Sequence, residues 1–438
     1  ATDGYGNIRE DALSCWNPGA TLANEGLSVS KGGAGLTIQT ATRSFKTYKT
    51  GTGMLAFNST NITAADLDLS TDAQRDDLIN FVTGSGIYSA TSGDDKQREW
   101  LMGDIVHSKP AVLYDRTNNK NVIFLGANDG FLHCFVDSDQ GTSDNLEDDV
   151  VEEKWAFIPW ELLPNLKTLP PQNATDEITG DANHDWFVDG SPVVYENGSS
   201  TNLIFGLRRG GDGYYCLNVD DYTAPTWQWG ITNSILGGET LGQSWSTPRV
   251  CKIKASGGTS ETNVILLTGG YDTNQDNADP GAGDSKGRAV FAIDAGSGAL
   301  VSNLKFYHGD GGFGSSYMNY CIVEMASYDD NGDDSDDVIY AGDLGGNLFV
   351  FNDKDADGAW VPRRLFDAGT DGGTQYLRKF TKTPGIAQET WGDYVYIGSG
   401  DREHPVETDT LNRFYAIKNT WPATYNNGSP ITASDLVD

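Results

Sequence analysis

The sequence predicts an all-β fold, a β-propeller with blade insertions and a few short helices, and three observations support this prediction. The 438 residues include 53 glycines, and Trp, Tyr and Phe together make up 11% of the chain. Glycines suit tight turns and aromatic residues favour strands, so this composition is typical of many short strands joined by turns. The third observation is an internal repeat, which a propeller requires because its blades are variants of one unit.

In its fullest form, the repeat has a polar strand entry with Ser or Thr and Pro, an apolar strand, a Gly-rich turn and an aromatic-rich strand. Five copies are clear, and their apolar strands begin at Val122, Leu203, Val264, Val338 and Tyr394. The spacing of roughly 55 to 80 residues exceeds the roughly 40 to 50 of compact propeller repeats, so insertions are expected within the blades. The segments before Leu101 and after Ile417 are expected to supply one or two weaker blades and the strand exchange that closes the ring.

Only two segments are expected to be helical. The first ends near Val82, where apolar residues such as Leu78 and Ile79 recur at helical spacing and Thr71 can act as the N-cap. The second is a short, proline-bounded segment at residues 159–166. Both are expected to be packing elements.

Charge and cysteine content disfavour several classes of function. Acidic residues outnumber basic ones by 62 to 30, for a formal charge of -32, so the chain repels phosphate backbones and we expect no nucleic-acid partner. No apolar run of about 18 residues is present, so no membrane span is expected. The five cysteines form no C-x-x-C motif, and three of them lie in apolar runs where a small buried side chain is expected: Cys134, Cys216 and Cys321.

The acidic segment at residues 329–337 is the clearest chemical signal. Oxygen-bearing side chains stand at its first, third, fifth, seventh and ninth positions: Asp329, Asn331, Asp333, Ser335 and Asp337. Calcium takes about six to eight oxygen ligands, and the first part of an EF-hand loop supplies them at this spacing. Ser335 can offer its carbonyl, and Gly332 favours a sharp turn. Tyr340 replaces the usual final glutamate, so the sequence predicts an EF-hand-like calcium loop on a β scaffold.

Three other acidic loops are weaker candidates. Asp181–Asp189 has matching spacing, but Trp186 and its neighbours look like strand. The loops that begin at Asp272 and Asp353 have the first three ligand positions and lack the last. A plain acidic turn is the preferred interpretation of each loop.

Catalytic motifs are absent from the sequence, which contains no G-x-S-x-G, no H-E-x-x-H and no phosphate-binding glycine loop. The five histidines are scattered and are interpreted as structural. We therefore expect no enzyme activity and no catalytic residue. One alternative is a quinoprotein-like dehydrogenase, because Ala292–Gly298 is similar to a turn of propellers that bind pyrroloquinoline quinone; the single copy of this turn disfavours it. A carbohydrate-binding or hydrolytic propeller is a third alternative.

Four motifs resemble those of the C-terminal propeller of PilY-type type IV pilus tip adhesins: Gly103–Pro110, Gly126–Gly130, Phe187–Pro192 and Tyr340–Leu348. They occur in the order typical of that family, and the resemblance covers about residues 40 to 420. It implies a modified seven-bladed β-propeller whose acidic loop binds calcium, with calcium occupancy regulating pilus extension and retraction. The calcium ligands it implies are Asp329, Asn331, Asp333, Ser335 and Asp337.

The resemblance also implies domain limits, partners and location. Residues 1–40 would be an extension or a connection to an N-terminal domain absent from this chain, and residues 41–438 the propeller. The start at Ala1 fits a mature or excised fragment. The expected partners are minor pilins or the pilus tip complex. A ligand on a surface or on a host is expected in addition. The expected location is extracellular, at the pilus tip or outer cell surface after secretion through the periplasm. No Arg-Gly-Asp tripeptide occurs, so integrin-type adhesion is not expected.

Overall fold

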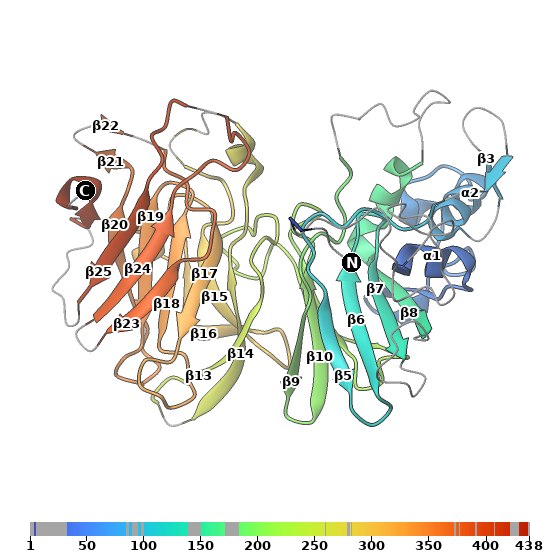
Figure 1. The fold of residues 1–438 in the computed structure, drawn as a ribbon, viewed down its shortest axis with the longest axis horizontal. Coiled ribbons are helices and arrows are strands. Elements are labelled where there is room, and N and C mark those ends of the chain that lie inside the picture. The colour runs from blue at the N-terminus through green and yellow to red at the C-terminus, as the bar shows by residue number, and fades with distance from the viewer. Residues whose placement is uncertain are drawn as a thin grey trace. The chain divides into compact units, whose positions relative to one another are not determined.

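The computed structural model describes residues 4–5, 33–84, 87–89, 95–97, 100–138, 150–170, 184–258, 260–277, 281, 283–371, 374–375, 377–389, 392–406, 408–420 and 429–436. These residues form mainly short strands in several sheets, with a few short helices (Figure 1). The predicted all-β class is therefore confirmed. The chain divides into two compact units, called unit 1 and unit 2 below: Ala1–Ile204 with Cys216–Trp227, and Phe205–Tyr215 with Gln228–Asp438.

Unit 1 contains a six-stranded sheet in the order β2-β1-β8-β7-β6-β5. Its strands are β1 (Phe45–Lys49), β2 (Gly53–Ala56), β5 (Ala111–Asp115), β6 (Lys120–Gly126), β7 (Leu132–Ser138) and β8 (Val150–Pro159). β1 pairs with β8 in parallel, with Phe45 opposite Ala156. β1 and β2 thus extend the sheet of the first repeat, and the described residues before Leu101 form no separate sheet of three or more strands. A short hairpin joins β3 (Ile87–Ser89) and β4 (Asp95–Gln97).

The second repeat forms a four-stranded sheet in the order β12-β11-β10-β9. Its strands are β9 (Val193–Asn197), β10 (Ser200–Gly206), β11 (Tyr214–Asn218) and β12 (Thr226–Ile231).

Three sheets of unit 2 hold the remaining repeats, and their strands run from yellow to red in Figure 1. The first has the order β13-β14-β15-β16: β13 (Arg249–Lys254), β14 (Glu261–Thr268), β15 (Ala289–Asp294) and β16 (Leu300–Tyr307). The second has the order β17-β18-β19-β20-β26: β17 (Ile322–Tyr328), β18 (Val338–Asp343), β19 (Asn347–Asn352), β20 (Val361–Asp367) and β26 (Ile431–Thr432). The third is β23 (Gly385–Glu389), β24 (Gly392–Gly398) and β25 (Phe414–Asn419).

The end of the chain also joins an existing sheet. β26 pairs with β20 in parallel, with Ile431 opposite Phe366, so the described residues after Ile417 do not form the expected further blade. A two-stranded hairpin, β21 (Thr370–Asp371) with β22 (Thr374–Gln375), follows β20. Five sheets of three or more strands in the described residues agree with a propeller. The count of seven blades and the domain limit at residue 40 stay predictions.

Strand β18 is buried on both faces. Ile339 and Ala341 belong to one core cluster, with residues of β14 and β15. Val338 and Tyr340 belong to a second cluster, with residues of β24 and β25. Successive side chains of a strand point to opposite faces, so this sheet packs between two neighbours as a blade does. Burial of each large apolar side chain stabilises the fold by about 1.5 to 3 kcal/mol, which makes β18 a rigid support for the loop before it.

Both predicted helical segments are present. α2 (Asp72–Thr83) begins with a capping box, in which the Thr71 hydroxyl accepts from the Gln74 backbone and the Gln74 side chain accepts from the Thr71 backbone. The second segment is the 3-10 helix η4 (Trp160–Thr168). The restriction to two helical segments is wrong, because the described residues also include α1 (Gly33–Thr40), α3 (Phe313–Tyr317), η2 (Ala65–Leu67), η5 (Thr273–Asp276) and η6 (Ala433–Asp435).

Among the described helices, none has the length and apolar character needed to cross a membrane. Cys134, Cys216 and Cys321 are buried and form no disulfide, which confirms the prediction for these three side chains. Cys15 lies outside the described residues.

Candidate metal centre

The loop at residues 329–337 closes the hairpin between β17 and β18. Tyr328 and Val338 are paired directly before and after it. The backbone N–H of Asp337 donates to the Tyr328 carbonyl at 2.9 Å, and the backbone N–H of Asp353 donates to the Asp337 carbonyl at 2.7 Å. The last residue of the loop is therefore fixed to β17 on one side and to the residue after β19 on the other.

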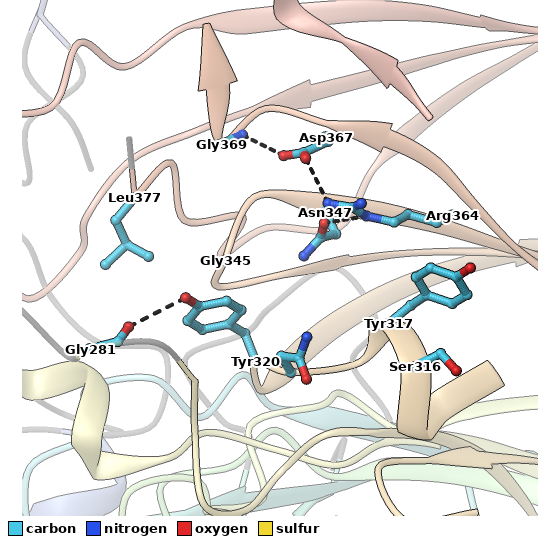
Figure 2. A pocket seen from close by; sticks show the side chains of 11 residues that line it. Gly281, Ser316, Tyr317, Tyr320, Gly345, Asn347, Arg364, Asp367, Gly369 and Leu377 are labelled. Atoms are coloured by element: carbon cyan, nitrogen blue, oxygen red, sulfur yellow. Dashed lines mark hydrogen bonds and ion pairs between the residues drawn. The ribbon is translucent and has the colours of Figure 1, made fainter. Parts of the chain in front are cut away.

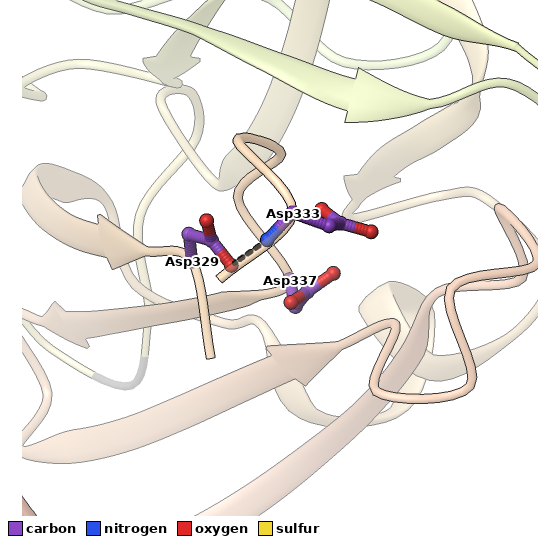
Figure 3. A group of neighbouring side chains, drawn as sticks. All are labelled: Asp329, Asp333 and Asp337. Carbon is purple, nitrogen blue, oxygen red and sulfur yellow. Dashed lines mark hydrogen bonds between the residues drawn. The ribbon is translucent and has the colours of Figure 1, made fainter. Parts of the chain in front are cut away.

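Three carboxylates converge in this loop. One oxygen from each of Asp329, Asp333 and Asp337 lies within 4.8 Å of the other two, and Figure 3 shows the three side chains facing a common space. Asp329 also shapes the loop, because its Oδ1 accepts from the Gly332 backbone at 2.6 Å and its Oδ2 from the Asp334 backbone at 2.8 Å. Gly332 has a φ of 81°, a conformation that costs glycine little, so the predicted turn at Gly332 is confirmed.

Two oxygens of the loop are buried without a hydrogen-bond partner among the described residues, Ser335 Oγ and Asp337 Oδ1. Ser335 is 0% and Asp337 1% exposed. Burial raises the pKa of Asp337 to about 6, and the negative charges of Asp333 and Asp329 add to this effect. Buried oxygens normally have a partner. These oxygens and the raised pKa of Asp337 are the pattern expected of a site that takes a cation.

Three lysines from other parts of unit 2 contact the loop. The Lys254 ammonium, on β13, lies 3.0 Å from Asp333 Oδ2 and 3.1 Å from Glu261 Oε1. Lys252 pairs with Asp334, and the Lys354 ammonium lies 2.9 Å from Asp330 Oδ2. Reasoning from sequence missed Lys252 and Lys254, because β13 is distant from the loop along the chain, and it also missed Lys354, which follows β19.

The structure places the five predicted ligands as follows. The carboxylates of Asp329, Asp333 and Asp337 lie together. The Asn331 side-chain oxygen accepts from the Asp333 backbone at 2.9 Å, and Ser335 contributes a buried hydroxyl in addition to its carbonyl. All are oxygen donors of the kind that calcium prefers. Calcium binding by this set stays a prediction.

The weaker acidic loops use their carboxylates within the protein. Asp272 caps η5 through the Asn274 backbone, and its Oδ2 accepts from the Ser285 backbone at 2.8 Å. Both oxygens of Asp353 accept from the Gly358 backbone, at 3.0 and 2.9 Å. These contacts are those of acidic turns. Residues 181–183 of the remaining candidate lie outside the described residues.

The histidines and the quinone-like turn also have structural contacts. Each histidine lies within hydrogen-bond distance of a carboxylate or a backbone carbonyl: His107, His133, His184, His308 and His404. In the turn after β15, the Asp294 carboxylate accepts from the backbone of Gly296 and Ser297. The Asp294 carboxylate therefore stabilises the turn between β15 and β16.

Comparison with known proteins gives a consistent result. A model of the PilY1 beta-propeller domain matches residues 89–359. A type IV pilus biogenesis factor PilY1 homologue of Xylella fastidiosa is 26% identical over 350 residues, covering 73% of this chain and 25% of the relative. PilY1 of Pseudomonas aeruginosa PAO1 is 27% identical over 310 residues, covering 64% of this chain and 23% of the relative. The chain thus spans about a quarter of the length of the curated relatives it matches.

Among solved structures, the C-terminal domain of Pseudomonas aeruginosa PilY1 is similar, with 24% identity and a TM-score of 0.48, over 72% of this chain and 60% of that one. The family match covers more than half of the chain and includes the whole loop at residues 329–337. The chain therefore belongs to the PilY1 beta-propeller domain family.

Proposed function

We propose that this chain is the calcium-binding β-propeller domain of a type IV pilus tip-associated protein. In this proposal the domain acts in pilus assembly, in control of extension and retraction, and in surface adhesion. It works outside the cell, at the pilus tip or outer cell surface, with minor pilins or the tip complex as partners. Its relatives are named pilus biogenesis factors, and no enzyme activity is proposed.

The observation that carries the calcium proposal is the arrangement of oxygens in the loop at residues 329–337. Three carboxylates face one space, and the buried Ser335 hydroxyl and Asp337 Oδ1 have no partner among the described residues. A divalent cation here would offset the repulsion between the carboxylates and supply the partner that these two oxygens lack. The five predicted ligands suit calcium because each of them offers an oxygen atom that can coordinate the ion.

The residues on both sides of the loop connect it to a neighbouring sheet. The hydroxyls of Tyr328 and Tyr340 both donate to Asp393 Oδ2 on β24, at 2.5 and 2.6 Å. Asn419 on β25 donates to the Tyr340 hydroxyl at 2.7 Å. If calcium orders the loop, these hydrogen bonds would transmit the change to β24 and β25. Ion binding would in this way alter a surface of the domain.

Calorimetric titration of calcium into the EDTA-treated protein tests the ion site. We expect saturable binding and a higher melting temperature with calcium, because an ion that binds only the folded state stabilises it. Asp333→Ala should abolish most of the affinity, since Asp333 is one of the three converging carboxylates.

Asp330→Ala is the matched control for this titration. It removes the same charge from the same loop, but its carboxylate pairs with Lys354 and lies outside the predicted ligand set. We expect it to keep most of the affinity. Equal losses in the two variants would reduce the site to general attraction by an acidic loop, and no binding by the unaltered chain would overturn the calcium proposal.

The pilus role is tested separately in cells that carry the full-length protein. With Asp333→Ala, we expect a clear change in the number of surface pili or in pilus-driven motility, whereas Asp330→Ala should behave like the unaltered protein. If Asp333→Ala loses calcium without changing either measure, the ion site is structural and regulation of the pilus by calcium is wrong.

A further inference from the structure

A polar cavity of about 330 Å³ lies in unit 2 beside the turn between β18 and β19. This turn lies within the Tyr340–Leu348 motif and outside the calcium loop at residues 329–337. Sites for small molecules measure about 300 to 1,000 Å³, so the cavity suits a ligand of one or two rings. Figure 2 shows Asn347, Arg364 and Asp367 on one side and Tyr317 and Tyr320 on the other.

The wall formed by Asn347, Arg364 and Asp367 is a continuous chain of hydrogen bonds anchored on a buried carboxylate. Asp343 is 0% exposed, and its Oδ2 accepts from Asn347 Nδ2 at 2.7 Å. Asn347 Oδ1 accepts from Arg364 Nε at 2.7 Å, and Arg364 Nη2 donates to Asp367 Oδ2 at 2.6 Å. The Gly369 backbone donates to Asp367 Oδ1 at 2.9 Å. Charge-assisted bonds of this kind hold polar groups in place before a ligand arrives.

The opposite wall is aromatic and depends on a glycine. A side-chain carbon at Gly345 would lie only 2.0 Å from the Tyr320 ring, so the ring rests directly against the turn backbone. The Tyr320 hydroxyl donates to the Gly281 carbonyl at 3.3 Å, which fixes the far end of the ring. Tyr317, at the end of α3, adds a second half-buried ring to this wall.

These two walls select one class of ligand. The guanidinium of Arg364 and the carboxylate of Asp367 neutralise each other, so the cavity has no surplus charge to favour an anion or a cation. The Asn347 amide N–H can donate a hydrogen bond, and the Asp367 carboxylate oxygens beside it can accept one. Each hydroxyl group of a ligand both donates and accepts, so two adjacent hydroxyl groups fit such a pair. Tyr317 and Tyr320 add aromatic surface that packs well against C–H groups. We infer that this cavity binds one or two units of a neutral saccharide.

Saturation-transfer NMR with a panel of sugars tests this inference. The neutral probes are D-glucose, D-galactose, D-mannose and N-acetyl-D-glucosamine, and N-acetylneuraminic acid is the anionic comparison. We expect saturable binding of at least one neutral sugar, with a Kd on the order of 1 mM because the site is small. The anionic sugar should bind more weakly than that sugar.

Two serine-to-tryptophan variants locate the binding. Ser316 is an exposed cavity-lining residue, and Ser302 is exposed on β16 outside the lining. Ser316→Trp should weaken binding at least about tenfold, whereas Ser302→Trp should leave it unchanged. Asn319→Trp, at another exposed point of the cavity, should repeat the loss and shows that misfolding of one variant is not the cause.

Three results would overturn the inference. They are no saturable binding of any neutral sugar up to about 50 mM, binding that survives both cavity variants, and tighter binding of the anionic sugar. The melting temperature of each cavity variant is compared with that of the unaltered protein. Equal values show that the substitution affects only the cavity. None of these results bears on the calcium site, so the two proposals fail independently.

Discussion

At the scale of single residues, the candidate metal centre depends on oxygens that the protein itself leaves without donors. Asp329 is largely occupied with the loop backbone, whereas Ser335 Oγ and Asp337 Oδ1 are buried without a partner among the described residues. A buried polar atom without a partner costs about 1 to 3 kcal/mol. A cation bound to these two atoms would therefore remove this free-energy cost.

Substitution of Ser335 separates its hydroxyl from its carbonyl as a ligand. In EDTA, we expect Ser335→Ala to be as stable as the unaltered protein or up to about 1 kcal/mol more stable, because an unpaired buried hydroxyl is removed. In calcium, we expect about tenfold weaker affinity. Thermal melting in both conditions, with calorimetry, checks this.

Ser327→Ala is the contrasting variant, since the Ser327 hydroxyl donates to Asp336 and accepts from Arg249. It should lower stability equally with and without calcium. Unchanged calcium affinity in Ser335→Ala would mean that only its carbonyl serves the ion.

At the scale of elements, β13 supplies Lys252 and Lys254, two of the three lysines that contact the loop at residues 329–337. The Lys254 ammonium lies 3.0 Å from Asp333 Oδ2 and also contacts Glu261, so it competes with a cation for Asp333 and has an alternative partner on β14. The loop and this strand are distant along the chain, and they are joined by the ion pairs and by a hydrogen bond of 2.8 Å from the Asp336 backbone N–H to the Lys252 carbonyl.

Lys254→Gln should raise calcium affinity about two- to fivefold, because it removes both a competitor and a nearby positive charge. Calorimetry at low ionic strength is the measurement. Lys305→Gln, an exposed position on β16 at the opposite edge of the same sheet, makes the same change in net charge and should have little effect. Equal gains in the two variants would contradict a specific role for Lys254.

Strands β7 and β8 of unit 1 hold a buried ionic cluster of His133, Glu153, Asp129 and Arg43. His133 lies 2.7 Å from Glu153 and 3.2 Å from Asp129, and Arg43 forms two hydrogen bonds with Glu153. Burial by itself would lower the His133 pKa, but the charges of Asp129 and Glu153 outweigh it and raise the pKa to about 9. Burial would raise the Glu153 pKa, but Arg43 and His133 lower it to about 2.

These shifts predict how unit 1 responds to pH. The contribution of His133 is complete below its unfolded pKa of about 6.5 and is lost as pH rises through about 9, whereas that of Glu153 is lost only as pH falls from about 4.5 through 2. We expect amide exchange in β7 and β8 to accelerate between about pH 6.5 and 9 beyond its intrinsic rise. His133→Gln should cost about 3 to 5 kcal/mol and remove this extra dependence. The same dependence in the variant would exclude His133 as its source.

Local patterns predicted much of this structure. The helix cap at Thr71 is formed with Gln74, three residues later in the chain, and the oxygen spacing of the loop at residues 329–337 is a property of nine consecutive residues. Tertiary contacts were not predictable in this way. The parallel pairing of β1 with β8 joins distant segments, and the burial of Ser335 depends on packing around the loop. α1 was missed because Gly33 and Gly35 are poor helix formers.

At the scale of the whole molecule, the formal charge of -32 favours cations and repels polyanions. The calcium affinity should therefore fall as salt rises, because the Debye length shrinks from about 30 Å at 0.01 M to about 3 Å at 1 M. Titrations in tetramethylammonium chloride separate this screening from competition by sodium. An affinity independent of salt would show that only the carboxylates in direct contact with the ion matter.

The proposed function depends on calcium binding at the loop between β17 and β18, and a calcium-soaked crystal with an anomalous difference map would locate the ion. We expect a peak at about 2.3 to 2.6 Å from oxygens of Asp329, Asn331, Asp333, Ser335 and Asp337. The same crystal form in EDTA should lack the peak. A saturated crystal with no peak at this loop, or with its calcium held only by other residues, would show that these five residues do not form a calcium site.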